Sequence, residues 1–141
     1  MAADIEKLAR DIYAAINAHD LDKVLSFHTD DVFVESPAGG RVMHGKEELR
    51  ASLNGYFGAF SNFIMELTSF FASGNRSWEE WVVSGTHTGS FQGLPPTGKT
   101  ISLRGILVRE VKEGKTYQVT EYYDSATIMR QLGLLPPIPQ K

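Results

Sequence analysis

The segment from Trp78 to Thr100, WEEWVVSGTHTGSFQGLPPTGKT, decides how the chain folds. It begins with aromatic and β-branched residues, which are typical of strands. Between residues 93 and 98 it carries two glycines and two prolines, and neither a helix nor a central strand can continue through such a run. A second apolar run begins at Ile101. The pattern therefore predicts two strands joined by a long loop, which is a β-hairpin.

Alternating apolar residues predict further strands on both sides of this hairpin. From Phe63 the apolar residues recur with period two, and Gly74-Asn75 predicts a tight turn before the hairpin. The strand Ile101–Val111 has apolar residues on both faces, so we expect it to be central and covered on both sides. Glu113-Gly114 predicts a turn into a last strand at Thr116–Asp124. Together these segments predict a four-stranded antiparallel meander.

Helices are predicted mainly before the sheet. Helical spacing of apolar residues predicts three N-terminal helices, at about Asp4–Ala18, from Leu21 to about His28, and at about Lys46–Phe60. A short strand, Val32–Ser36, interrupts them, and a short helix, Ser125–Leu132, ends the fold. Helices followed by a run of strands indicate an α+β fold, and 141 residues fit a single domain over residues 1–141. A strongly curved sheet around three helices would enclose a cavity.

Composition excludes several classes of function. The chain has 14 basic and 17 acidic residues without a basic cluster, which argues against nucleic acid as a partner. Cysteine is absent, so disulfides, thiolate zinc sites and cysteine nucleophiles are excluded. No apolar run approaches the roughly 20 residues that span a bilayer, and the charged N-terminal segment does not resemble a signal peptide, so we expect a cytoplasmic protein without a membrane partner. The four histidines are not spaced as metal ligands, and we expect no metal.

Several short motifs occur in order along the chain. They are NAHDLD at 17–22, TDDV at 29–32, HGKEEL at 44–49, GTHTG at 85–89, GLPPTGK at 93–99, YD at 123–124 and QLG at 131–133. In this order they resemble the NTF2-like superfamily and, within it, the SnoaL-like polyketide cyclases. The resemblance implies a cone-shaped fold, with three N-terminal helices on a strongly curved antiparallel sheet. It also implies an internal cavity for a small hydrophobic carbonyl compound, and a homodimer.

The resemblance also implies a type of chemistry. These cyclases close a ring by intramolecular aldol addition without a cofactor, because the substrate C–H lies between carbonyl groups and one carboxylate can accept and return its proton. The position that resembles the cyclase acid is Asp124, which we take as the candidate catalytic residue. The strand Ile101–Val111 lacks the histidine that such cyclases often add. Related ketosteroid isomerases carry a basic Asp where this chain has Ser36, which argues against their chemistry.

Three other polar residues are secondary candidates. In a regular strand Glu121 and Asp124 point to opposite faces, so only one of them can enter the cavity. Burial among aromatic residues would raise the pKa of Glu121, while Asp124 could instead cap the helix that follows it. His87 could donate a hydrogen bond to a carbonyl, but bracing the hairpin is the role we favour. Arg104 could pair with a carboxylate or bind an anionic ligand.

Aromatic residues are the expected walls of the cavity. The candidates for its lining are Tyr13, Phe33, Tyr56, Phe57, Phe60, Trp81, Tyr122 and Tyr123. Three functions stay open from the sequence. The chain could be a cofactor-independent acid–base enzyme of cyclase or isomerase type, a non-catalytic protein that binds a small ligand in the same cavity, or a dimeric interaction module.

Overall fold

Three helices in the N-terminal part form one layer of the fold in the computed structural model, which describes residues 2–140. They are α1 (Ala2–Asn17), α2 (Leu21–Ser26) and α3 (Gly45–Ala59). Apolar residues at helical spacing give α1 one buried side, on which Ile5, Ile12 and Ile16 lie. The Asp20 side chain accepts a hydrogen bond from the Lys23 amide at 3.2 Å and caps α2. The three predicted helices are thus confirmed.

Six strands form a single mixed sheet in the order β2-β1-β6-β5-β4-β3. They are β1 (His28–Ser36), β2 (Arg41–His44), β3 (Phe60–Ser73), β4 (Arg76–His87), β5 (Thr100–Lys112) and β6 (Lys115–Tyr123). Strands β3 to β6 are the predicted antiparallel meander. The rest corrects the prediction of an entirely antiparallel sheet. Strand β1 pairs with β6 in parallel, and β2, which was not predicted, pairs with β1 after a 3₁₀ turn at Pro37–Gly39.

The turns of the meander lie where the sequence places them. Gly74-Asn75 joins β3 to β4, and Glu113-Gly114 joins β5 to β6. Glu113 and Gly114 have φ of 53° and 78°, which is the left-handed pair that a two-residue hairpin turn requires. The long loop of residues 88–99 joins β4 to β5, so the predicted hairpin is confirmed.

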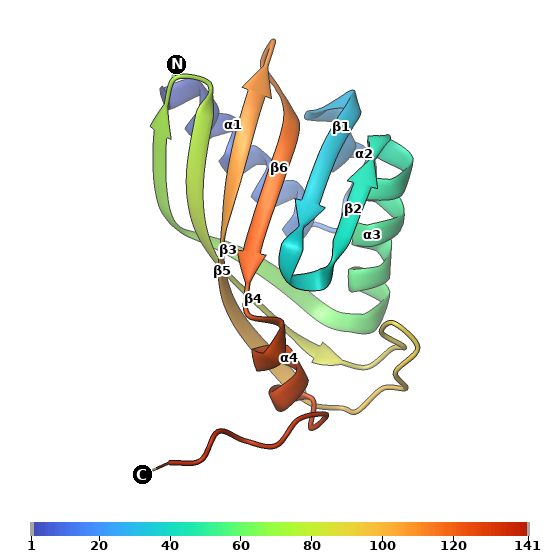
Figure 1. Ribbon diagram of the computed structural model, residues 1–141. Helices are drawn as coiled ribbons and strands as arrows, with labels where there is room; N and C mark the ends of the chain where they lie inside the picture. The colour runs from blue at the N-terminus through green and yellow to red at the C-terminus, as the bar shows by residue number, and fades with distance from the viewer. Residues whose placement is uncertain (1, 141) are drawn as a thin grey trace.

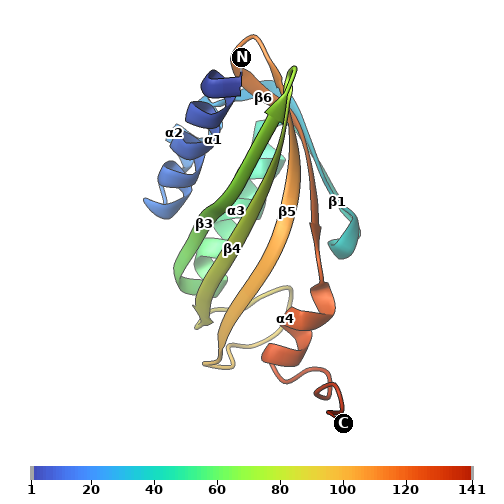
Figure 2. The same ribbon diagram turned by 90° about the vertical axis from the view of Figure 1, so that its left-hand side faces the viewer.

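The sheet is strongly curved, and the three N-terminal helices all lie on one of its faces (Figures 1 and 2). Irregular register in β3, between Ser61 and Ile64 and again between Leu67 and Ser69, fits this curvature because bulges increase the twist of a strand. Helix α4 (Ser125–Gln131) follows β6 and lies at the end of the sheet (Figure 1). Gly133 has φ of 82° just after α4, as expected for its predicted capping role.

The two faces of the sheet differ in burial. Odd-numbered residues of β4 and β5, such as Trp81, Val83 and Leu103, face the helices and are buried. On the opposite face of β5, Ser102 and Arg104 are exposed. The expectation that this strand is covered on both sides is therefore wrong, because the helices cover only the concave face. None of the helices in residues 2–140 has the length and apolar character needed to cross a membrane.

Gly105 makes room for the largest side chain of the inner face. It pairs with Trp81 across β4 and β5, and a Cβ atom at residue 105 would collide with the Trp81 indole ring. The indole therefore lies over the backbone of β5 instead of beside a second side chain. This arrangement is possible only where residue 105 is glycine.

We expect Gly105→Ala to lower the free energy of unfolding by about 1–3 kcal/mol, because the methyl group collides with the Trp81 ring and forces it out of its position. Urea unfolding measures the change. Gly55→Ala is the matched control, since a Cβ atom there meets nothing within 4 Å in α3, and it should stabilise by about 0.5–1 kcal/mol. Equal effects of the two changes would contradict this explanation.

Candidate active site in the cavity between helices and sheet

A cavity of about 200 Å³ lies between the concave face of the sheet and the helices. Its wall is mainly apolar and includes Ile12, Phe63, Leu103, Ile128 and Met129. Side chains with polar groups also line it, namely Tyr13, His28, Tyr56, Trp81, Gln92, Arg109, Glu121, Tyr123 and Ser125. A small number of polar groups in an apolar cavity is the usual composition of a small-molecule site.

Glu121 brings the one carboxylate among the residues that line the cavity. It lies on the inner face of β6 with Val119 and Tyr123, and within residues 2–140 it makes no hydrogen bond or ion pair. Burial raises the pKa of Glu121 above the ordinary 4.5, while the charges of Arg109 and Arg41 act in the opposite direction without cancelling the effect. An unpaired carboxyl group with a raised pKa is suited to proton transfer.

Asp124 does not line the cavity. Strand β6 ends at Tyr123, and Asp124 is the N-cap of α4. Its carboxylate accepts hydrogen bonds from the Ala126 amide and from the Thr127 hydroxyl, both at 3.0 Å. Asp124 is thus exposed and engaged at the helix start, which corresponds to the capping role that we considered beside the catalytic one. Of the two rival acids, Glu121 is the one whose side chain enters the cavity.

Two tyrosine hydroxyls lie on the wall near the turn between β1 and β2. Ser36 Oγ donates to Tyr123 Oη at 3.2 Å, and Arg41 Nη2 donates to Tyr56 Oη at 2.7 Å. Each hydroxyl therefore accepts a hydrogen bond from the β1–β2 turn region, and a hydrogen bond between Tyr56 and Tyr123 contributes to the raised pKa of Tyr56. Tyr123 is two residues from Glu121 on the same face of β6, so a donor and a carboxyl group meet in one part of the cavity.

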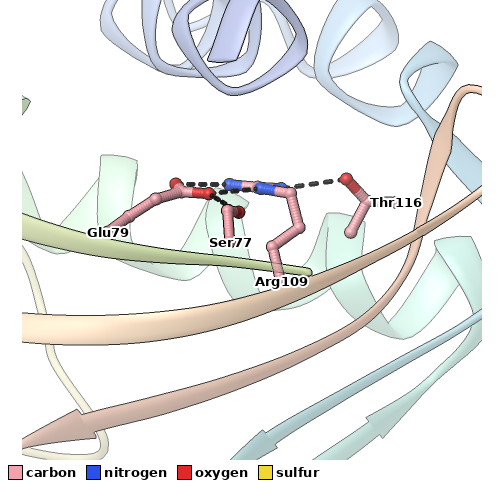
Figure 3. A network of polar contacts seen from close by, with 4 residues as sticks. All are labelled: Ser77, Glu79, Arg109 and Thr116. Carbon is pink, nitrogen blue, oxygen red and sulfur yellow. Dashed lines mark hydrogen bonds and ion pairs between the residues drawn. The ribbon is translucent and has the colours of Figure 1, made fainter. Parts of the chain in front are cut away.

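A buried ion pair forms another polar part of the wall (Figure 3). Arg109 Nε and Nη2 donate to the two carboxylate oxygens of Glu79 at 2.8 and 3.0 Å, and Arg109 Nη1 donates to Thr116 Oγ1 at 2.9 Å. Ser77 Oγ donates to Glu79 at 2.7 Å. Burial raises the pKa of Glu79, but Arg109 and these hydrogen bonds outweigh it and hold the pKa below 4.5. Glu79 is thus ionised at neutral pH.

Sequence reasoning missed both members of this ion pair. A usable signal was present, because Glu79 shares its strand parity with Trp81 and Val83, and Arg109 shares its parity with Leu107. Charged residues in phase with buried apolar ones on two neighbouring strands indicate a buried pair. Arg104, for which we expected a carboxylate partner or an anionic ligand, is exposed on the outer face and makes no ion pair in the described part of the chain.

Tyr13 and His28 complete the polar wall. The Tyr13 hydroxyl is buried next to Glu79, and burial, followed by the Glu79 charge and its hydrogen bond, raises the pKa of Tyr13. His28 Nδ1 donates to the Val24 carbonyl at 2.8 Å. Burial, followed by the charge of Arg109, lowers the pKa of His28 to about 4. The imidazole is therefore neutral at neutral pH.

His87 lies outside the cavity lining and holds the long loop. Its Nδ1 accepts a hydrogen bond from the Thr97 amide at 3.2 Å and lies 2.9 Å from Thr97 Oγ1. Its backbone bonds to Lys99 and Gly98. These contacts correspond to the bracing role that we favoured over ligand binding. In residues 2–140, no group of three or more His, Asp or Glu side chains is arranged to hold a metal ion.

The structure separates the eight aromatic candidates into two sets. Five of them line the cavity, namely Tyr13, Tyr56, Phe60, Trp81 and Tyr123. Three do not, which corrects that part of the prediction. Phe57 stacks on His19 at 4.1 Å between ring centroids, Phe33 packs on His44, and Tyr122 is 50% exposed on the outer face of β6.

A family model for SnoaL-like polyketide cyclases matches residues 6–132. The chain belongs to the SnoaL-like polyketide cyclase family. The match covers the helices, the whole sheet and α4, so it includes every element that lines the cavity. A search of curated proteins finds no significant match.

Solved structures resemble this chain along nearly their whole length. AclR, a candidate hydroxylase from Streptomyces galilaeus, has a TM-score of 0.87 at 24% identity, over 99% of this chain and 87% of AclR. IdmH, a candidate polyketide cyclase from Streptomyces antibioticus, has a TM-score of 0.79 at 20% identity, over 91% of this chain and 97% of IdmH. A protein from Catenulispora acidiphila with a ketosteroid isomerase-like fold has a TM-score of 0.79 at 16% identity, over 91% of this chain and 93% of that protein. At these identities the likeness shows the NTF2-like fold.

The placement of Asp124 leads to a test of stability. We expect Asp124→Ala to lower the free energy of unfolding by about 1 kcal/mol, because the first turn of α4 loses its cap. Asp124→Asn is the matched control and should lower the free energy of unfolding by only a few tenths of 1 kcal/mol, since the amide oxygen can still accept the Ala126 hydrogen bond. Thermal or urea unfolding measures both. An unchanged stability of Asp124→Ala would show that the cap contributes nothing.

His28 should make the fold sensitive to acid. Its pKa is about 4 in the folded chain against 6.5 for the free side chain, so the unfolded state binds more protons between these values and stability falls as the pH drops from 6.5 to 4. The difference corresponds to about 3 kcal/mol. Urea unfolding at several pH values should show this loss, and His28→Gln should lack it. The same acid sensitivity in both proteins would contradict the assignment.

Proposed function

We propose that this protein is a cofactor-independent acid–base enzyme that acts on a small hydrophobic carbonyl compound, of the aldol cyclase type, with Glu121 as its proton-transfer group. The observation that carries the proposal is the unpaired Glu121 carboxyl group in a mainly apolar cavity. Membership of the cyclase family supports the type of reaction. Glu121 takes the role that the sequence comparison gave to Asp124.

The proposed reaction needs one proton carrier. The Glu121 carboxylate accepts the proton of a C–H bond between two carbonyl groups, and the electron pair moves into an enolate. The Tyr123 hydroxyl can donate a hydrogen bond to the enolate oxygen, since Ser36 already supplies the bond that the tyrosine oxygen accepts. The enolate carbon then attacks a carbonyl carbon of the same molecule, and the new alkoxide takes the proton back from Glu121.

The size of the cavity limits the ligand. An apolar cavity of about 150 Å³ is known to hold benzene, so about 200 Å³ suits a ring with a short side chain. Gln92 from the long loop and Ser125 from α4 line the cavity and are exposed, which places its open end between these segments. A larger substrate would extend through this opening.

Two further proposals come from the family and from the outer face of the sheet. A non-catalytic protein that binds the same ligand remains the alternative, and the lack of a histidine in β5 favours it. We also propose a homodimer, as the family resemblance implies. Tyr122, with half of its surface exposed, and the neighbouring Ile106 give β5 and β6 apolar surface that a partner copy could cover.

The test uses 2-methyl-1-phenylbutane-1,3-dione, an apolar diketone with one hydrogen between two carbonyl groups. We expect the wild-type protein to accelerate exchange of that hydrogen for deuterium, as followed by proton NMR. Glu121→Gln should lose about 10²-fold or more of the acceleration, because a positioned general base contributes about 10²–10⁴. The wild-type rate should rise with pH through the raised pKa of Glu121, since the ionised form is the base.

Asp124→Asn is the matched control for this test, because it removes the charge of the rival acid and keeps its cap. Its exchange rate should stay within about twofold of wild type. Full activity of Glu121→Gln, or a loss confined to Asp124→Asn, would contradict the proposed role of Glu121. Binding of the diketone without accelerated exchange would identify the non-catalytic alternative.

A further inference from the structure

Two carboxylates and one guanidinium group lie together on the inner face of the sheet. Leu107 of β5 pairs with Glu79 of β4 on one side and with Glu121 of β6 on the other. Arg109 is two residues further along β5 on the same face, so it lies diagonally next to both acids. By position alone, Arg109 could pair with either carboxylate.

The hydrogen bonds of Arg109 go to Glu79 and Thr116, and none goes to Glu121. Arg109 makes two hydrogen bonds with Glu79 and one with Thr116, and Ser77 holds the same carboxylate from behind (Figure 3). Arg109 is 3% exposed and Glu79 is fully buried. Such a bidentate ion pair fixes the plane of the guanidinium group. Glu121 receives none of these bonds.

We propose that Glu79 is a positioning residue, which holds Arg109 away from Glu121 and so keeps the Glu121 carboxyl group unpaired in the cavity. The role of Glu79 in catalysis rests on the proposed function, but its effect on the pairing of Arg109 and Glu121 does not. Apart from Glu79, Glu121 is the only carboxylate on the inner faces of β4, β5 and β6 in the described chain. A buried guanidinium group released from Glu79 needs a new acceptor, and Glu121 is the one next to it.

Pairing with Arg109 would make Glu121 a poorer base. An arginine at hydrogen-bonding distance lowers the pKa of a carboxyl group by about 1–3 units and occupies its oxygens. The other titratable or charged groups that act on Glu121 come from the remaining elements around it, namely Tyr13 of α1, Arg41 of β2, Tyr56 of α3 and Tyr123 of β6. His28 of β1 lines the same cavity. None of these residues is replaced in the variants below, and Tyr13, which lies next to Glu79, is uncharged at neutral pH because its pKa is raised.

The test is the pKa of Glu121 in Glu79→Gln, measured by NMR titration of ¹³C-labelled glutamate carboxyl groups, with Glu121→Gln used to assign the signal. We expect the pKa of Glu121 to fall by about one unit or more relative to wild type, because Arg109 turns to it. The pH profile of deuterium exchange should shift to lower pH by the same amount. An unchanged or raised pKa would overturn the proposal.

The double variant Glu79→Gln/Arg109→Met separates positioning from simple charge. It removes the guanidinium group together with the Glu79 charge, so the pKa of Glu121 should not fall below the wild-type value. A fall equal to that of Glu79→Gln alone would show that the Glu79 charge acts directly, and would overturn the positioning role. If Glu79→Gln does not fold, Glu79→Asp is the substitute. It keeps the negative charge, but its side chain is one methylene group shorter and holds Arg109 less well, so the pKa of Glu121 should again fall.

These measurements distinguish the inference from the proposed function, since the titration needs no substrate. If the pKa of Glu121 falls in Glu79→Gln but the wild-type protein does not accelerate exchange of the diketone hydrogen, the proposed enzymatic function is contradicted and the role of Glu79 is supported. Exchange that depends on Glu121, with a pKa that does not move in Glu79→Gln or Glu79→Asp, would contradict the role of Glu79 alone.

Discussion

The buried ion pair between Glu79 and Arg109 governs the electrostatics of the cavity. It ties β4 to β5 and, through Thr116, to the start of β6. Because the pair is neutral as a whole, it leaves the apolar wall without a free cation where the strands meet. The one cavity carboxylate, Glu121, is unpaired, and burial raises its pKa against the opposing charges of Arg109 and Arg41. In the arrangement that we propose, the ion pair keeps Arg109 from pairing with Glu121.

The alternation of side chains along β6 decides which acid belongs to the cavity. Val119, Glu121 and Tyr123 face the helices, and the strand ends directly after Tyr123. Asp124 then falls at the start of α4, where its carboxylate satisfies amide groups that the helix leaves without partners. A tyrosine and a glutamate two residues apart on one face give the cavity both a donor and a proton acceptor.

Much of the fold could be predicted because its signals are local. The hairpin around residues 88–99 and the turn at Glu113-Gly114 follow from glycine and proline positions. The parallel pairing of β1 with β6 could not be predicted, because it joins segments that are far apart in the chain and has no local signature. The short strand β2 was missed for the same reason, since its four residues gain their regular structure only beside β1.

The site was predicted less well than the fold. Family resemblance pointed to Asp124, and the same residue is a good helix cap, so sequence alone could not separate the two roles. Strand parity correctly reduced the choice to one of two acids, but which face is concave depends on the packing of the helices. The ion pair of Glu79 and Arg109 was missed because neither charge was a candidate, although both lie in phase with buried residues.

The central claim is that Glu121 is an unpaired carboxyl group in an apolar cavity. Its pKa in the wild-type protein, from carboxyl ¹³C chemical shifts followed over a pH titration, tests this most directly. We expect a value clearly above the ordinary 4.5. A value at or below 4.5 would mean that Glu121 is paired or solvated, and would contradict its role as the proton-transfer group.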